Sequence, residues 1–332
     1  MTMNALGDMA QLFVSRNHNT LLRHRLDELT AQLATGEATD LARQVGGDGR
    51  RLSAIDHGLT TIQSFISGAT EFLHTMASAQ LSLDRFDDAR SQAADQMLLF
   101  SGDGAEPSLD HAASAAATAL NDMVGAMNAS FAGRSLFAGA ATDRNALVDA
   151  GEILNQVKAL TSGLSDAGDI ISAVDDWFYS AGGGFETIAY TGDDGGYRQN
   201  QISTESVLQF DVRADDLGVR KALRAAVLGA LATSPLPDAE RQTLVQTASE
   251  GMVSTAHDIS QLQARIGQLE NRADSALASH EAQKYAWSQA RSDLTQIDPY
   301  ETITELQDVE SRLQMHYEMT ARLSRLSLAE YI

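Results

Sequence analysis

Apolar residues recur at helical spacing near the start of the chain. Between residues 2 and 34 the leucines fall on the a and d positions of one heptad frame: Leu12, Leu22, Leu26, Leu29 and Leu33. Gly36 follows at once, and a glycine in this place is typical of a helix end. The pattern predicts an N-terminal amphipathic helix with one apolar seam.

Two more helices are predicted before the middle of the chain. Residues 37–52 contain three glycines and predict a loop. Residues 53–100 carry isoleucine, leucine and phenylalanine at roughly helical spacing, which predicts a long helix. The segment 101–108 has two glycines and a proline and predicts a turn, after which the alanine-rich residues 108–131 predict a third helix.

The C-terminal part shows the same periodicity. Asp238 to Ile297 contain no proline, and a helix of this length would extend about 90 Å, more than a compact domain of this size needs. Asp298-Pro299 interrupts it, because the residue before a proline avoids the α region. A last helix then runs toward the C-terminus, and its apolar positions include Leu306, Leu313, Leu323 and Leu328.

The middle of the chain differs in composition. Residues 140–218 hold 14 acidic and 4 basic residues, so a quarter of the chain carries about half of the net charge of −21. Residues 186–212 are rich in aromatic and β-branched positions and predict two or three short strands. Within them TGDDGG (191–196) predicts a hairpin turn, and residues 216–233 return to a helical pattern.

These patterns predict a mainly α protein with a small α+β insert. The N- and C-terminal helices are expected to pair in a long helical bundle or coiled coil, because amphipathic helices gain most of their stability from packing. We expect three domains: 1–45 with 299–332 as a terminal coiled coil, 46–139 with 234–298 as a helical bundle, and 140–233 as an acidic outer domain.

Charge and composition exclude several classes of protein. A net charge of −21 argues against a general nucleic-acid binder and against binding to an anionic membrane. The chain has no cysteine, so disulfides and thiolate metal sites are excluded. The N-terminus has no basic and apolar signal-peptide pattern, and no apolar run is long enough to predict a transmembrane helix.

The sequence contains no pattern of catalytic chemistry. The eight histidines are scattered without metal-ligand spacing, so we expect no metal, no cofactor and no enzymatic activity. The stretch SFAGRSLFAG (130–139) resembles a phosphate-binding loop only superficially, because it follows a predicted helix and lacks the lysine. We interpret it as a domain joint: Gly133 and Gly139 permit a turn, while Leu136 and Phe137 anchor that turn to the helical domain.

Four segments resemble the flagellin superfamily, and within it the flagellar hook–filament junction family (hook-associated protein three). They are LDELTAQLATGEATD (26–40), NASFAGRSLFAGAATDRNAL (128–147), ETIAYTGDDGGYRQNQI (186–202) and MTARLSRLSLAEYI (319–332). The order of these segments is more specific than any one of them. The sequence departs from the family where GGDGRRL replaces the usual Asp-Asp-Pro after the first helix.

The resemblance implies a structural subunit of the bacterial flagellum. Such subunits are synthesised in the cytoplasm, held by an export chaperone, and secreted through the flagellar type III apparatus without a cleaved signal peptide. They assemble into an extracellular ring between the hook with its neighbouring junction protein and a second junction protein or flagellin. The predicted assembly interface is the leucine seam of the two terminal helices.

Two alternatives to a junction subunit stay open. The chain could be a flagellin that forms the filament itself, or a coiled-coil adaptor whose insert recognises a ligand. An enzyme in residues 140–235 is disfavoured, because that segment shows no convergent polar pattern.

Overall fold

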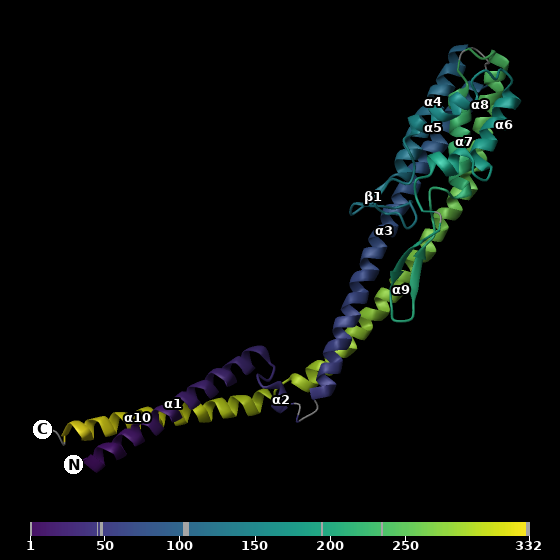
Figure 1. Ribbon diagram of the computed structural model, residues 1–332. Coiled ribbons are helices and arrows are strands. Elements are labelled where there is room, and N and C mark those ends of the chain that lie inside the picture. The colour runs from purple at the N-terminus through teal and green to yellow at the C-terminus, as the bar shows by residue number, and fades with distance from the viewer. Residues whose placement is uncertain are drawn as a thin grey trace. The chain divides into compact units, whose positions relative to one another are not determined.

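The computed structural model describes residues 2–44, 46, 49–101, 106–193, 195–233 and 235–329. Its contacts divide the chain into two compact units. The terminal unit comprises Met1–Gln63 and Glu281–Ile332, and the central unit comprises Ser64–His280. Both are built mainly from long helices, as Figure 1 shows, which confirms the predicted fold class.

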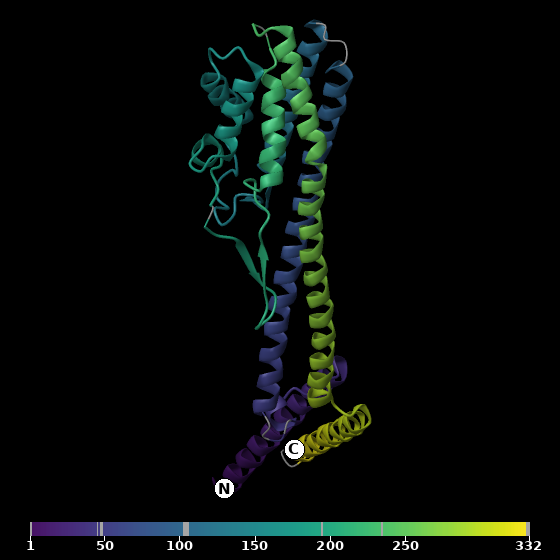
Figure 2. The same cartoon turned by 90° about the vertical axis from the view of Figure 1, so that its right-hand side faces the viewer.

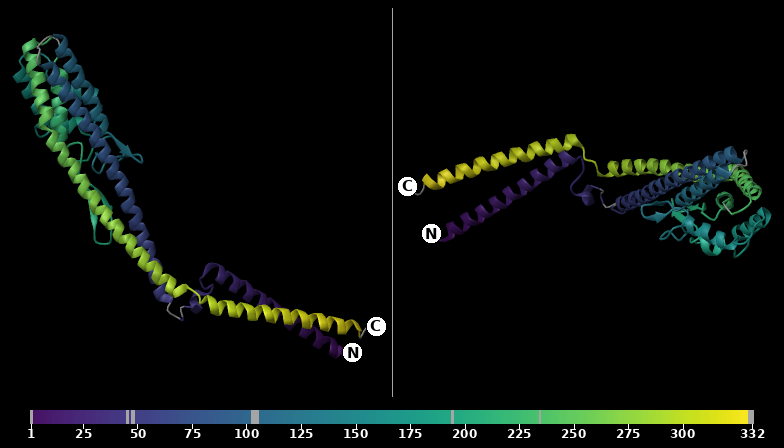
Figure 3. Two further views of the ribbon diagram at one scale, coloured as in Figure 1. Left: turned by 180° about the vertical axis from the view of Figure 1, so that it is seen from behind. Right: turned by 90° about the horizontal axis from the view of Figure 1, so that it is seen from above.

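The terminal unit joins the two ends of the sequence. It contains α1 (Thr2–Thr35), α2 (Leu41–Gln44), the start of α3 (Gly49–Ser101), the end of α9 (Ala256–Thr295), and α10 (Pro299–Ala329). Helices α1 and α10 lie side by side, with both chain termini at the same end of the pair (Figures 1 and 3). The pair is therefore antiparallel.

The central unit has a core of closely packed helices. The rest of α3, α4 (Glu106–Met127), α7 (Leu217–Leu231), α8 (Asp238–Ser254) and the first part of α9 share one apolar core (Figure 2). Small residues set the spacing, since a Cβ added to Gly229 on α7 would lie 2.6 Å from the Ala116 Cβ on α4. The alanine-rich pattern of α4 thus permits close approach of the helix axes.

Smaller elements pack on this core. They are α5 (Ala150–Leu160), α6 (Ala167–Tyr179), a π-helical turn η1 (Phe185–Ala189), and two separate antiparallel hairpins. The first hairpin pairs β1 (Ser130–Phe131) with β2 (Arg134–Ser135), and the second pairs β3 (Arg198–Gln201) with β4 (Val207–Phe210).

The structure corrects the predicted strands near residue 187. Thr187 and Ile188 lie in η1, because burial of Phe185 and Ala189 beneath α6 outweighs the local β-propensity. The described residues of the expected turn, 191–193 with 195 and 196, do not connect two paired strands; the hairpin of β3 and β4 reverses at 202–206 instead.

Several predicted helix boundaries are also wrong. The expected loop 37–52 contains α2 and the start of α3, and the expected single helix 238–297 divides into α8 and α9 at Thr255. The side chain of Thr255 is buried and donates a hydrogen bond to the Met252 carbonyl at 2.8 Å, which competes with the regular helical pattern there. Helix α4 ends at Met127 rather than 131, because β1 begins at Ser130.

Two predictions cannot be compared directly with these elements. The core of the expected turn 101–108, residues 102–105, lies outside the described residues. The three-domain division remains a prediction; the boundaries of the two compact units lie within α3 and α9. No helix in the described ranges combines the length and apolar character needed to span a membrane.

Candidate functional site

The seam between α1 and α10 is a compact apolar cluster. Leu22 and Leu29 from α1 meet Val309 and Leu313 from α10, and Leu29 is only 1% exposed. Leu26 and Leu306 pack against this cluster and are partly buried. The heptad spacing of both helices produces this seam, because positions three and four residues apart share one helix face.

Polar contacts beside the seam fix the pairing of the two helices. Arg25 donates three hydrogen bonds to the Glu305 carboxylate, at 2.8 and 3.0 Å from Nη2 and at 3.2 Å from Nε, and this contact raises the pKa of Arg25. Arg23 donates to the Tyr317 hydroxyl at 2.8 Å, which lowers the pKa of that phenol. Because Arg23 lies two residues before Arg25 and Tyr317 twelve after Glu305, both contacts require antiparallel helices.

A short backbone ladder closes the base of the terminal helix pair. The Ala38 amide donates to the Thr295 carbonyl at 2.9 Å, and the Ile297 amide donates to the Gly36 carbonyl at 3.1 Å. Gly36 adopts φ +73°, a left-handed conformation that ends α1 and turns the chain toward Thr295. The segment after α1 and the connection between α9 and α10 are thereby held together.

The predicted assembly residues fall into three groups in the structure. Leu22, Leu29 and Leu313 are buried in the seam, while Leu26, Leu33 and Leu306 are partly buried. The side chains of Leu12, Leu323 and Leu328 lie outside the described residues. Their role in assembly therefore stays a prediction.

A second apolar face was missed by the sequence reasoning. Phe13, Val14 and Leu21 on α1 are each 66% exposed, so they point away from the seam. On α10, Met315 and Met319 are 52% and 65% exposed. The seven-residue spacing of Val14 and Leu21 is a signal that could have found this face, because that interval returns to the same side of a helix.

The predicted joint begins with a two-residue hairpin turn. Phe131 pairs with Arg134 across the turn, and Ala132 and Gly133 both have positive φ, at 50° and 75°. Two consecutive left-handed residues define a type I′ turn, the geometry that matches the twist of a hairpin. Gly133 thus serves as a hairpin residue that follows α4.

Gly139 belongs to a more crowded part of the joint. It adopts φ +65°, and an added Cβ would overlap the Asp193 carbonyl oxygen and lie 3.1 Å from that of Gly196. The Asp193 amide donates to the Ala138 carbonyl at 3.0 Å, and the Ala214 amide donates to the Phe137 carbonyl at 3.0 Å. The glycine therefore lets three distant segments meet.

The apolar residues of the joint enter the core of the central unit. Leu136 is 3% exposed and Phe137 is fully buried, where its ring lies 6.2 Å from that of Phe210. Burial of two such side chains contributes on the order of 2 kcal/mol each. The segment is anchored as the sequence interpretation expects, and its role as a boundary between domains stays a prediction.

Asn128, which precedes the first hairpin, forms hydrogen bonds with the main chain of Leu147, which follows the joint. The Asn128 side chain donates to the Leu147 carbonyl at 2.9 Å and accepts from the Leu147 amide at 2.8 Å. Leu147 is 1% exposed, so water cannot readily replace these bonds.

We expect Asn128→Ala to lower the free energy of unfolding by about 2 kcal/mol, because both main-chain groups of buried Leu147 lose their partner. Asn121→Ala is the matched control: that exposed side chain donates to the Ala117 carbonyl of its own helix, and its loss should change stability by less than about 0.5 kcal/mol. Urea unfolding followed by circular dichroism measures both. Equal losses in the two variants would contradict the role given to Asn128.

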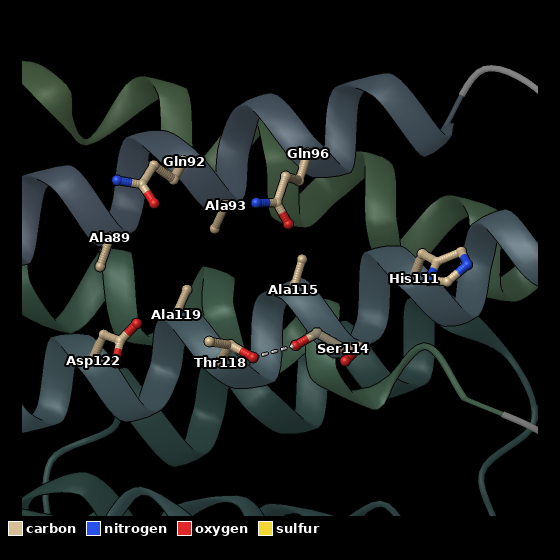
Figure 4. A pocket seen from close by; sticks show the side chains of 10 residues that line it. All are labelled: Ala89, Gln92, Ala93, Gln96, His111, Ser114, Ala115, Thr118, Ala119 and Asp122. Atoms are coloured by element: carbon tan, nitrogen blue, oxygen red, sulfur yellow. Dashed lines mark hydrogen bonds between the residues drawn. The ribbon is translucent and has the colours of Figure 1, made fainter.

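A shallow groove between α3 and α4 shows no catalytic arrangement. Figure 4 shows Gln92 and Gln96 from α3 facing Ser114, Thr118 and Asp122 from α4 across a line of alanines. The Thr118 hydroxyl donates to the Ser114 carbonyl at 3.0 Å, an ordinary bond within a helix. In the described ranges, no group of three or more histidine and acidic residues is placed to hold a metal ion.

Comparison with known proteins shows which class of protein this chain resembles. Residues 241–332 match the family described as the bacterial flagellin C-terminal helical region. Together with the paired terminal helices, this match confirms the resemblance to the flagellin superfamily. No curated protein matches the sequence.

Within that class, the fold is similar to a solved structure from Vibrio parahaemolyticus that is assigned to a flagellar hook-associated protein. The TM-score is 0.54 at 14% sequence identity, and the match covers 75% of this chain and 97% of the other. At this identity the likeness concerns the fold.

Proposed function

We propose that this protein is a structural subunit of the bacterial flagellum that joins the hook to the filament. The observation that carries the proposal is the terminal helix pair, whose inner seam is buried within the chain while a second apolar face stays uncovered. An apolar helix face left exposed is typical of a surface that another protein covers. The flagellin C-terminal match and the fold shared with a hook-associated protein support the flagellar setting.

Assembly follows from the geometry of the two faces. The α1–α10 seam makes each subunit's helix pair a preformed unit, so docking does not have to meet the full entropy cost of ordering both helices. Phe13, Val14 and Leu21 then contact neighbouring copies in a ring. Hook and first junction protein lie on one side of this ring, and second junction protein or flagellin lies on the other.

Deletion of the gene tests the proposal. We expect cells with hooks but without attached filaments, and with filament protein released into the medium, because the connecting ring is missing. Electron microscopy of the cells and immunoblotting of the medium measure both results. Complementation with the wild-type gene is the control, and normal attached filaments in the deletion strain would overturn the proposal.

The match of residues 241–332 to the flagellin C-terminal region also favours a second candidate, a flagellin that builds the filament. Copy number separates the two. A junction subunit is present at about one ring per flagellum, whereas a filament subunit is the most abundant protein of the purified organelle. Quantitative mass spectrometry of isolated flagella decides between them.

A further inference from the structure

The outer edge of β4 lines a groove beside α9. In the β3–β4 hairpin the Ile202 amide donates to the Ser206 carbonyl at 3.0 Å, which makes residues 202 and 206 a hydrogen-bonded pair. Such pairs alternate along an antiparallel ladder, so Leu208 and Phe210 use their main chain to bond β3. The main-chain groups of Val207 and Gln209 therefore face outward.

Helix α9 supplies the other wall of this groove. The hairpin runs beside α9 (Figures 1 and 3), and a cavity of about 330 Å³ opens between Val207, Gln209 and Asp211 on one side and Arg265, Gln268 and Arg272 on the other. This volume is in the range of ligand-binding clefts. The three polar side chains of α9 follow i, i+3, i+7 spacing and thus share one face.

Arg265 and Arg272 differ in their ion pairs. Arg265 binds the Asp211 carboxylate at 2.7 Å and that of Asp216 at 3.3 Å. Within the part of the chain that the structure describes, no carboxylate lies within ion-pair distance of Arg272, whose side chain is exposed. Arg272 is thus the arginine of this groove that is available to a carboxylate from another chain.

We propose that this groove binds an extended peptide segment that carries carboxylate side chains. The segment adds a third strand to the hairpin by bonding the outward main chain of Val207 and Gln209, as in β-augmentation. Its carboxylates pair with Arg272 and approach Gln268. This binding site does not rest on the proposed flagellar function.

The spacing of the two walls suits such a ligand. Gln268 and Arg272 are four residues apart on α9, which is about 6 Å along the helix axis, and alternate residues of a strand are about 6.8 Å apart. Two carboxylates on one face of the added strand can therefore reach Arg272 and the amide of Gln268 together. The peptide backbone supplies binding and the carboxylates supply selectivity.

A binding experiment with the full chain tests the proposal. The probe is a labelled eight-residue peptide that alternates valine and glutamate, compared with the same peptide carrying lysine in place of glutamate. A third peptide keeps the glutamates but is N-methylated at alternate residues, so it retains charge and loses strand-forming donors. Fluorescence anisotropy gives Kd, and residue-resolved hydrogen exchange reports on β4.

We expect the glutamate peptide alone to bind and to slow amide exchange at Val207 and Gln209. Arg272→Glu should raise Kd about tenfold, since attraction becomes repulsion. Arg322→Glu, an equal charge change on the exposed surface of α10, is the matched control and should leave Kd unchanged. Gln209→Pro removes one outward donor but no bond to β3, and should abolish binding while circular dichroism stays native.

Three results would overturn the proposal. They are no binding of the glutamate peptide up to about 1 mM, equal Kd for wild type and Arg272→Glu, and unchanged exchange at Val207 and Gln209 when the peptide is saturating. Because Arg272 is exposed, its substitution leaves the fold intact, so the test holds even where Gln209→Pro fails to fold.

Discussion

Replacing Leu29 with aspartate will separate α1 from α10. Leu29 is 1% exposed and contacts the apolar cluster that includes Leu22 and Leu313, so the change removes a large buried side chain and places a carboxylate within that apolar cluster. We expect the helix pairing to lose at least about 3 kcal/mol. Leu313→Asp removes the same contact from the other side and should act alike.

Hydrogen exchange in residues 15–33 and 303–320 measures this effect, because the amides of a separated helix pair lose protection. Leu21→Asp is the matched control: it makes the same chemical change one residue from Leu22, at a side chain that is 66% exposed. Protection should survive in Leu21→Asp. Unchanged protection in Leu29→Asp would show that the seam does not hold the pair together.

The two variants also separate folding from assembly. In a motility assay of the complemented deletion strain, Leu29→Asp and Leu313→Asp should fail because their helix pair is lost. Under the proposed function Leu21→Asp should fail as well, although its helix pair is intact, since it alters the uncovered face. A Leu21→Asp strain with full motility would remove this face from the assembly interface.

Gly139→Ala will destabilise the central unit far more than Gly133→Ala. Both glycines have positive φ, so alanine costs about 1 to 2 kcal/mol of backbone energy at either site. At Gly133 nothing lies within 4 Å of an added Cβ, whereas at Gly139 it overlaps the Asp193 carbonyl oxygen. We expect a total of about 3 kcal/mol or more for Gly139→Ala, and only the backbone cost for Gly133→Ala.

Urea unfolding of the two single variants gives the difference, and amide exchange at Asp193 locates it. The Asp193 amide bonds to the Ala138 carbonyl at 3.0 Å, so a displaced loop should exchange faster there in Gly139→Ala alone. If the free energy of unfolding fell equally in both variants, the close approach of residues 139 and 193 would not contribute to stability.

The sequence predicted the long helices well because their signal is periodic. A heptad seam such as Leu22, Leu26 and Leu29 repeats the same information every turn, and it correctly indicated which face is buried. The four prolines lie at or outside helix ends in the described chain or in the first turn, where a proline is tolerated. The prolines thus agree with helix ends, whereas no proline marks the break between α8 and α9 at Thr255.

The middle of the chain was harder, because tertiary contacts decide its local structure. Thr187 and Ile188 have high β-propensity, yet Phe185 is drawn beneath Trp177 and the backbone forms a π-helical turn. The TGDDGG segment has hairpin composition, but its glycines serve close packing against Ala138 and Ala140. Neither contact is visible in a short window of sequence.

The sequence indicated the buried seam of the candidate site but not its exposed apolar residues. Heptad analysis finds the residues that a helix buries against one partner, so it identified the α1–α10 seam and overlooked Phe13, Val14 and Leu21. The groove beside β4 left no signal either. Its walls come from Gln209 and Arg272, which are far apart in the chain, and it depends on which way the main chain of one short strand faces.

The terminal unit contains residues from both ends of the sequence, and this determines when it can form during synthesis. Residues 64–280 form one continuous segment that can fold as soon as it is made, whereas α1 must wait for α10. At roughly 5 to 20 residues per second, a ribosome takes about 15 to 50 s to travel from the end of α1 to the start of α10. The leucines of α1 stay uncovered throughout that interval, so the terminal unit is the last part of the molecule to form.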